Sequence, residues 1–233
     1  MDASKIGVVF DCDGTLLDSM GVWHGLQNEL AERAGGTLTV DDVAALAPMS
    51  IPECGAFFHE KFGLGESDRE VVGMIDEYML DFYRHRAEAR PGALEFVQGL
   101  AQAGAHLTVA SSSPKPYLMA GIERCGFAPY LERVLSVEDV HSTKREPDVW
   151  DRAREIMGTS KELTWGVEDS AYAIGTLAGA GYRTLAIYDS DDAGTWDALQ
   201  ASAEHAIRSF EGLTVEEFLA WNEQPLFVGT ANK

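Results

Sequence analysis

Short apolar runs recur along the chain, and most of them are continuous rather than alternating with polar residues. They are rich in β-branched side chains and lie at 6–10, 106–110, 133–137, 164–167, 184–187 and, more weakly, 206–207. Continuous apolar runs are typical of parallel strands that are covered on both faces. Helical periodicity separates most of these runs, and three of the helical segments, 91–104, 114–126 and 147–158, begin at a proline and stop at a glycine. This alternation predicts an α/β fold with a doubly wound parallel sheet.

One region lacks strand-like runs and shows helical periodicity alone. Helices are predicted there over 22–36, 40–47, 51–63 and 67–89. An all-helical stretch that follows directly after the first strand indicates an insertion into the α/β core. The sequence therefore predicts a catalytic core of residues 1–18 and 90–233, with a helical cap domain of residues 19–89 inserted in it.

The charge balance limits the partners that the protein can have. The chain carries 38 acidic against 18 basic residues, a net charge of −20, which argues against a nucleic acid or an anionic membrane as partner. Its three cysteines show no disulfide or zinc-ligand spacing, and no signal-like or membrane-spanning apolar run is found. We expect a cytoplasmic protein, and the oligomeric state cannot be read from the sequence.

Polar residues follow four of the predicted strands and should meet at one edge of the sheet, where ligands bind in folds of this class. Asp11 and Asp13 follow the first strand. The other three strands are followed by Ser111 and Ser112, by Lys144 and Arg145, and by Glu168 and Asp169. Carboxylates gathered at one point repel each other unless a cation joins them, and hard oxygen ligands without His or Cys favour Mg²⁺. The set suits phosphoryl transfer, with a nucleophilic aspartate, a second carboxylate for the proton, and a hydroxyl and a cation for the phosphoryl oxygens.

Four segments, "DCDGT", "VASSS", Lys144 with Pro147-Asp148, and "GVEDS", resemble in order and spacing the four motifs of the haloacid dehalogenase superfamily. With its helical insertion, the chain is similar to the subfamily of β-phosphoglucomutases and small-molecule phosphatases, which implies a Rossmann-like core and a mobile cap. The resemblance implies the following roles: nucleophile and Mg²⁺ ligand for Asp11, general acid/base and carbonyl metal ligand for Asp13, phosphate binding for Ser111, Ser112 and Lys144, and completion of the metal site by Asp169 with Glu168.

Departures from the subfamily favour simple hydrolysis of a small phosphorylated metabolite. Trp23 and Ile51 stand where β-phosphoglucomutases carry a histidine and an arginine, and Asp13 is absent from dehalogenases, whose halide needs no proton. A sugar-phosphate mutase and a non-catalytic phospho-ligand binder remain alternatives. Arg145 occupies a position where many relatives have proline, so it could share the role of Lys144. In the cap, the residues expected to line the substrate pocket are Trp23, His24 and Met49.

Overall fold

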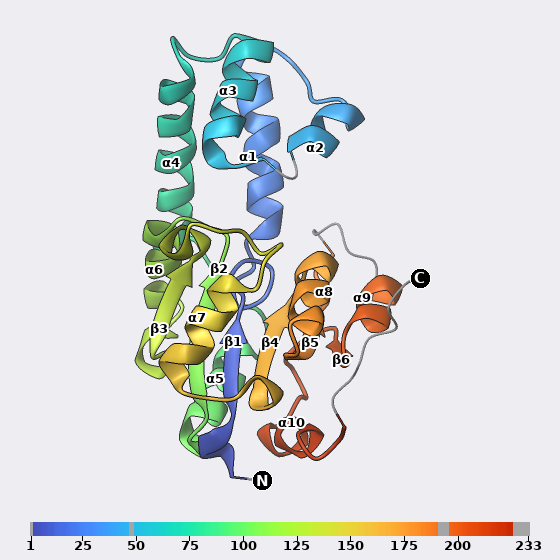
Figure 1. Cartoon of the computed structure of the whole chain (residues 1–233). Helices are drawn as coiled ribbons and strands as arrows, with labels where there is room; N and C mark the ends of the chain where they lie inside the picture. The colour runs from blue at the N-terminus through green and yellow to red at the C-terminus, as the bar shows by residue number, and fades with distance from the viewer. Residues whose placement is uncertain (1, 47–48, 191–195, 226–233) are drawn as a thin grey trace. The chain divides into compact units, whose positions relative to one another are not determined.

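The computed structural model describes residues 2–46, 49–190 and 196–225. It divides into two compact units, which we describe separately (Figure 1). One unit comprises Met1–Ser19 and Ala87–Lys233, and the other comprises Met20–Arg86. The sequence-based boundaries were 18/19 and 89/90. Among the described helices, none combines the length and apolar character that crossing a membrane requires.

The core unit is built on a parallel sheet in the order β3-β2-β1-β4-β5-β6. Its strands are β1 (Gly7–Phe10), β2 (His106–Ser111), β3 (Arg133–Ser136), β4 (Thr164–Glu168), β5 (Arg183–Ile187) and β6 (His205–Ile207). The six predicted strands are therefore confirmed within one or two residues at each end. The buried β1 lies between β2 and β4, as its continuous apolar pattern predicted.

Helices cover both faces of this sheet, which confirms the predicted α/β fold class. They are α5 (Ala93–Ala103), α6 (Lys115–Arg124), α7 (Asp148–Met157), α8 (Ala171–Gly179), α9 (Trp196–Ser202) and α10 (Val215–Trp221). On one face Val9 packs in a cluster with Trp150 of α7 and Leu177 of α8. On the other face Phe10 meets Phe96 of α5 edge to face, with ring centroids 6.5 Å apart. Consecutive residues of β1 thus supply both halves of the core, since side chains alternate along a strand.

The cap unit consists of α1 (Met20–Arg33), α2 (Val40–Leu46), α3 (Ile51–Phe62) and α4 (Asp68–His85). α3 packs closely on α4 at Gly55, where an added Cβ would lie only 2.5 Å from a Val72 methyl group. Ser50 and Glu53 form a capping box at the start of α3, and Gly63 ends this helix in the left-handed conformation. Residue 47, predicted as the end of the second helix, lies outside the described residues.

The last cap helix is shorter than its sequence pattern predicted. The helical pattern ran to Ala89, whereas α4 ends at His85. The amide of Asp18 donates to the Glu88 carbonyl at 3.0 Å, and the amide of Arg90 donates to the Leu16 carbonyl at 2.9 Å. These bonds pair the outgoing and returning chain segments in an extended conformation, which a helix through Ala89 would not allow. Long-range pairing has overridden the local helix preference here.

Candidate active site

The register of the sheet brings polar residues from three strands to one edge. Phe10 pairs with Val109 of β2 on one side and with Val167 of β4 on the other. The amide of Asp11 still bonds the Val167 carbonyl at 2.9 Å, so this aspartate is fixed at the end of β1. Ser111 and Glu168 close β2 and β4 at the same edge. The strand order reverses at β1, and the crevice beyond this point is where α/β sheets of this type bind ligands.

Lys144 joins the ends of β1 and β4 by two buried ion pairs. Its Nζ contacts Asp11 Oδ1 and lies 2.7 Å from Glu168 Oε1. The Lys144 side chain is only 3% exposed. Burial by itself would lower the pKa of Lys144, but the carboxylates of Asp11 and Glu168 outweigh burial and raise this pKa above its ordinary value. Lys144 is therefore a fixed cation at the end of the sheet.

The carboxylate side chains around Lys144 form a set that fits a divalent cation. Asp11, Glu168 and Asp169 each offer an oxygen within 4.8 Å of the others, and all three residues are buried. Burial raises the pKa of Asp11 although Lys144 opposes this, and the charge of Asp13 raises it further. Carboxylates gathered this closely repel each other. A divalent cation such as Mg²⁺ would reduce this repulsion, and it prefers such oxygen ligands.

Asp13 is held differently, by two serine hydroxyls. Ser19 Oγ donates to its Oδ1 and Ser113 Oγ donates to its Oδ2, each at 2.6 Å. The turn after Asp13 needs the positive φ of 72° at Gly14, a conformation that glycine adopts at little cost. The Asp13 carboxylate is thus oriented by two serine hydroxyls.

Arg90, in the segment that follows the cap unit, donates a hydrogen bond to this turn. Arg90 Nη1 donates to the Gly14 carbonyl at 2.7 Å and to Asp189 Oδ2 at 2.6 Å. Its Nη2 donates to the Tyr188 carbonyl at 2.7 Å. The planar guanidinium group suits such a fork because its five N–H groups point in fixed directions. Arg90 therefore ties the loop that carries Asp13 to the end of β5.

The predicted phosphate-binding residues lie in different surroundings. Ser111 is buried, and its Oγ accepts a hydrogen bond from the Ser113 amide at 3.1 Å. Ser112 is exposed. Lys144 belongs to the buried cluster, whereas the exposed Arg145 lies with its guanidinium carbon 5.5 Å from the Tyr172 ring centroid. Arg145 therefore takes no part in the ion pairs of Lys144.

The contacts that hold the turn after β1, which carries Asp13 and Gly14, could not be predicted from the sequence. Ser19 and Arg90 carry no motif signal, and Arg90 lies 76 positions from Gly14 and 99 positions from Asp189 in the chain. Ser113, the last residue of the "VASSS" segment, likewise bonds Asp13 through its hydroxyl. A hydroxyl six residues after Asp13 was the one local hint for Ser19.

The residues predicted to line the substrate pocket all belong to the cap unit. Trp23 is half-buried, and its indole N–H donates to the Tyr83 hydroxyl at 3.2 Å. His24 is exposed, and the Met49 amide bonds the Leu46 carbonyl at 3.0 Å. Their role in substrate binding stays a prediction.

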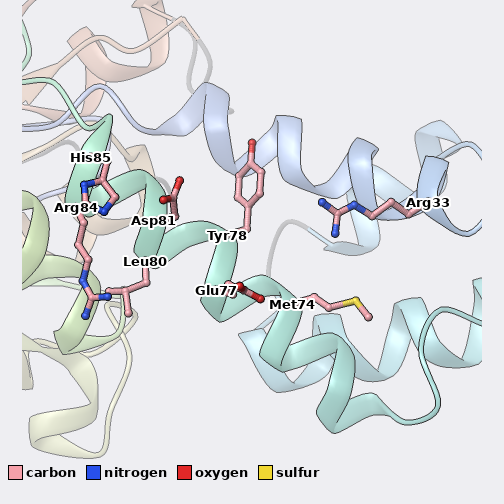
Figure 2. A pocket seen from close by; sticks show the side chains of 8 residues that line it. All are labelled: Arg33, Met74, Glu77, Tyr78, Leu80, Asp81, Arg84 and His85. Carbon is pink, nitrogen blue, oxygen red and sulfur yellow. The ribbon is translucent and has the colours of Figure 1, made fainter.

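A different set of cap residues lines a cavity of about 580 Å³ on α4 (Figure 2). The lining residues are Arg33, Met74, Glu77, Tyr78, Leu80, Asp81, Arg84 and His85. Arg33 reaches toward this face from α1, where it also pairs with Glu29 at 2.5 Å. The cavity thus lies along one helix face and carries charges of both signs.

Comparison with known proteins identifies the family. Residues 7–181 match the family model of the haloacid dehalogenase-like hydrolases. The chain belongs to this family. The match includes β1, β2, β3 and β4 with the helical insertion, so the predicted recognition and the prediction of an enzyme are both confirmed.

Several members of this hydrolase family resemble the chain at low identity. It is 26% identical over 191 residues to hexitol phosphatase A of Escherichia coli, covering 78% of this chain and 82% of that protein. It is 22% identical over 178 residues to the phosphoglycolate phosphatase of Rhodobacter capsulatus, covering 75% and 80%. A haloacid dehalogenase hydrolase of family IA from Entamoeba histolytica superposes with a TM-score of 0.76 at 20% identity, over 94% of this chain and all of that one.

Proposed function

We propose that the protein is a Mg²⁺-dependent phosphatase that hydrolyses a small phosphomonoester through a phosphoryl intermediate on Asp11. The observation that carries the proposal is the meeting of Asp11, Lys144, Glu168 and Asp169 at the carboxyl ends of β1 and β4. The relatives named for phosphoglycolate and for hexitol phosphates support a small phosphorylated metabolite as substrate.

In the first step, the Asp11 carboxylate attacks the phosphorus atom while the bond from phosphorus to the ester oxygen breaks. Lys144, next to Asp11, reduces the repulsion between this carboxylate and the anionic phosphoryl group, and Ser111 offers a hydroxyl to a phosphoryl oxygen. Asp11, Glu168, Asp169 and the Asp13 carbonyl would hold Mg²⁺, which supplies further positive charge at the phosphoryl oxygens.

Asp13 manages the proton in both halves of the reaction. It donates a proton to the departing ester oxygen, so that the product leaves as a neutral alcohol. The resulting carboxylate then takes a proton from water as this water attacks the phosphorus atom and releases Asp11. The hydroxyls of Ser19 and Ser113 keep the carboxylate oriented in both states, because a hydroxyl can either donate or accept a hydrogen bond.

The test is phosphate release from a panel of sugar phosphates, polyol phosphates and phosphorylated hydroxy acids with Mg²⁺, using Asp11→Asn as the blank. We expect release from at least one class of compound, and a loss of at least about a thousandfold in the variant, as for other nucleophile replacements. Its unfolding temperature checks that it is folded. If the wild type released phosphate from none of the compounds, the proposal would be contradicted. Isomerisation of a sugar phosphate without phosphate release would indicate a mutase.

A further inference from the structure

Arg145 lies beside the catalytic cluster but takes no part in it. Its backbone amide donates to Thr143 Oγ1 at 3.3 Å, which fixes the turn after β3, and its side chain is exposed. In the part of the chain that the structure describes, no carboxylate lies within ion-pair distance of its guanidinium group. In a chain with 38 acidic and 18 basic residues, an arginine that directly follows Lys144 and has no acidic partner among the described residues needs an explanation.

Tyr172 holds the Arg145 side chain close to the reacting groups. It lies in the first turn of α8, three residues after Asp169, and it is 52% exposed. The guanidinium carbon of Arg145 lies 5.5 Å from the ring centroid. Burial raises the pKa of the Tyr172 hydroxyl, and the charges of Glu168 and Asp11 raise this pKa further while Lys144 lowers it. The pair of Arg145 and Tyr172 therefore lies at the rim of the same site.

A second polar group completes this rim. Ser112 is exposed and follows directly after the buried Ser111, so its hydroxyl lies at the end of β2. An arginine stacked on an aromatic ring still exposes its N–H groups at the edge, where they bind a carboxylate or phosphate in a bidentate way. The rim therefore combines a guanidinium fork and a hydroxyl, both accessible to solvent.

We propose that Arg145 and Ser112, supported by Tyr172, form a subsite for a second anionic group of the substrate. The substrate is then a small phosphomonoester that also carries a carboxylate or another phosphate. This inference rests on the proposed function, whose phosphoryl site lies at Asp11 and Lys144. The net charge of −20 repels a polyanionic ligand, so its binding requires a local cation beyond those that hold the phosphoryl group.

The test compares ligands that differ only in the second group. Phosphoglycolate and hydroxyethyl phosphate have similar length and differ in a carboxylate, while propanediol bisphosphate and hydroxypropyl phosphate differ in a phosphate. Binding of each ligand with Mg²⁺ is measured by calorimetry in the Asp11→Asn background, which needs no turnover. Arg145→Gln should reduce the preference for the member with a second anionic group by about tenfold, the effect of losing one charge-assisted hydrogen bond.

Matched variants separate the subsite from bulk charge and from packing. Arg152→Gln removes the same charge from an exposed position on α7 and should keep the preference. Tyr172→Phe keeps the aromatic face and much of the preference, whereas Tyr172→Leu should lower it. The ligand pair whose preference is lost in Arg145→Gln tells whether the second group is a carboxylate or a phosphate.

Two results would overturn the subsite: no preference in Asp11→Asn with Arg145 intact for either ligand that carries a second anionic group, or an equal loss of preference in Arg145→Gln and Arg152→Gln. A wild type that shows the preference but releases no phosphate from any of the four compounds would contradict the proposed hydrolysis on these ligands and leave the subsite supported.

Discussion

The carboxylate of Asp13 accepts hydrogen bonds from two hydroxyls, and this arrangement fits the acid and base roles that we propose for Asp13. Ser19 and Ser113 each donate at 2.6 Å to a different oxygen. When one oxygen carries the proton, the hydroxyl next to it can turn and accept instead. The carboxyl group therefore keeps its orientation through the catalytic cycle without depending on its charge.

Replacing Asp13 by Asn should affect substrates according to their leaving groups. An alkyl ester needs a proton on the departing oxygen, so its kcat/KM should fall by roughly a hundredfold to ten-thousandfold, the usual contribution of general acid catalysis. Nitrophenolate leaves without a proton, so p-nitrophenyl phosphate should still phosphorylate Asp11. The intermediate then persists because the base is missing.

Rapid-mixing kinetics would detect this as one equivalent of nitrophenolate released in a burst, followed by a stalled reaction. Ser19→Ala is the milder control, because it removes one of the two orienting hydroxyls and keeps the carboxyl group. Equal losses with the alkyl and nitrophenyl esters in Asp13→Asn would contradict the acid role.

At the scale of elements, Arg90 connects the chain segment that returns from the cap with the turn after β1 and the end of β5. Arg90→Lys keeps a positive charge near Asp189 but cannot reach the Gly14 and Tyr188 carbonyls as well. We expect about a tenfold fall in kcat, equivalent to about 1.4 kcal/mol. The fall should be larger with an alkyl than with a nitrophenyl ester, because the brace acts through the loop of Asp13.

Arg152→Lys on the exposed face of α7 serves as the control for this exchange. If Arg90→Lys lowered the rates with both kinds of ester to the same extent, the brace would be a general structural contact and not a device that positions Asp13.

The packing of α8 on β4 leaves no room for an added methyl group, which can be tested by substitution. A Cβ at Gly166 of β4 would lie 2.3 Å from a methyl carbon of Leu177, which is fully buried. Gly166→Ala should therefore cost about 1–3 kcal/mol of unfolding free energy through overpacking. Gly175 lies on α8, as Leu177 does, and no atom lies within 4 Å of a Cβ added there. Gly175→Ala should therefore stabilise the protein by about 0.5–1 kcal/mol. Urea unfolding of both variants checks this, and an equal effect would contradict it.

The elements and the motif residues could be predicted from the sequence for a physical reason. Parallel strands such as β1 are buried on both faces and read as continuous apolar runs. The sheet register then brings Asp11, Ser111 and Glu168 to the same edge of the sheet. The contacts of Arg90 and the end of α4 could not be predicted, since both depend on pairing between distant segments. The helical pattern through Ala89 is a local signal, and the hydrogen bonds to residues 16–18 that override it leave no local trace.

At the scale of the whole molecule, the net charge of −20 and the cluster of carboxylates near Lys144 both predict that cations stabilise the folded protein. Mg²⁺ should raise the unfolding temperature, because it binds the folded site and not the unfolded chain. At one hundred times its Kd the gain is about 2.7 kcal/mol. This corresponds to a rise of about 5–10 °C for a chain of this size.

Sodium chloride at equal ionic strength controls for general screening of the acidic surface, and removal of Mg²⁺ by a chelator should reverse the rise. Asp169→Asn should reduce the specific part of the effect, while Glu155→Gln on the exposed side of α7 should not. If Mg²⁺ gave no more than the screening obtained with sodium chloride, the metal site would be contradicted.

Formation of a phosphoryl group on Asp11 is the central claim, and it can be measured directly. The Asp13→Asn variant is incubated briefly with Mg²⁺ and p-nitrophenyl phosphate, quenched in acid, digested and analysed by mass spectrometry. The account predicts that the peptide containing Asp11 gains the mass of one phosphoryl group, and that the same peptide from a variant also carrying Asp11→Asn gains none. Release of phosphate at the wild-type rate from an enzyme that lacks Asp11, or a phosphoryl group on another residue, would contradict it.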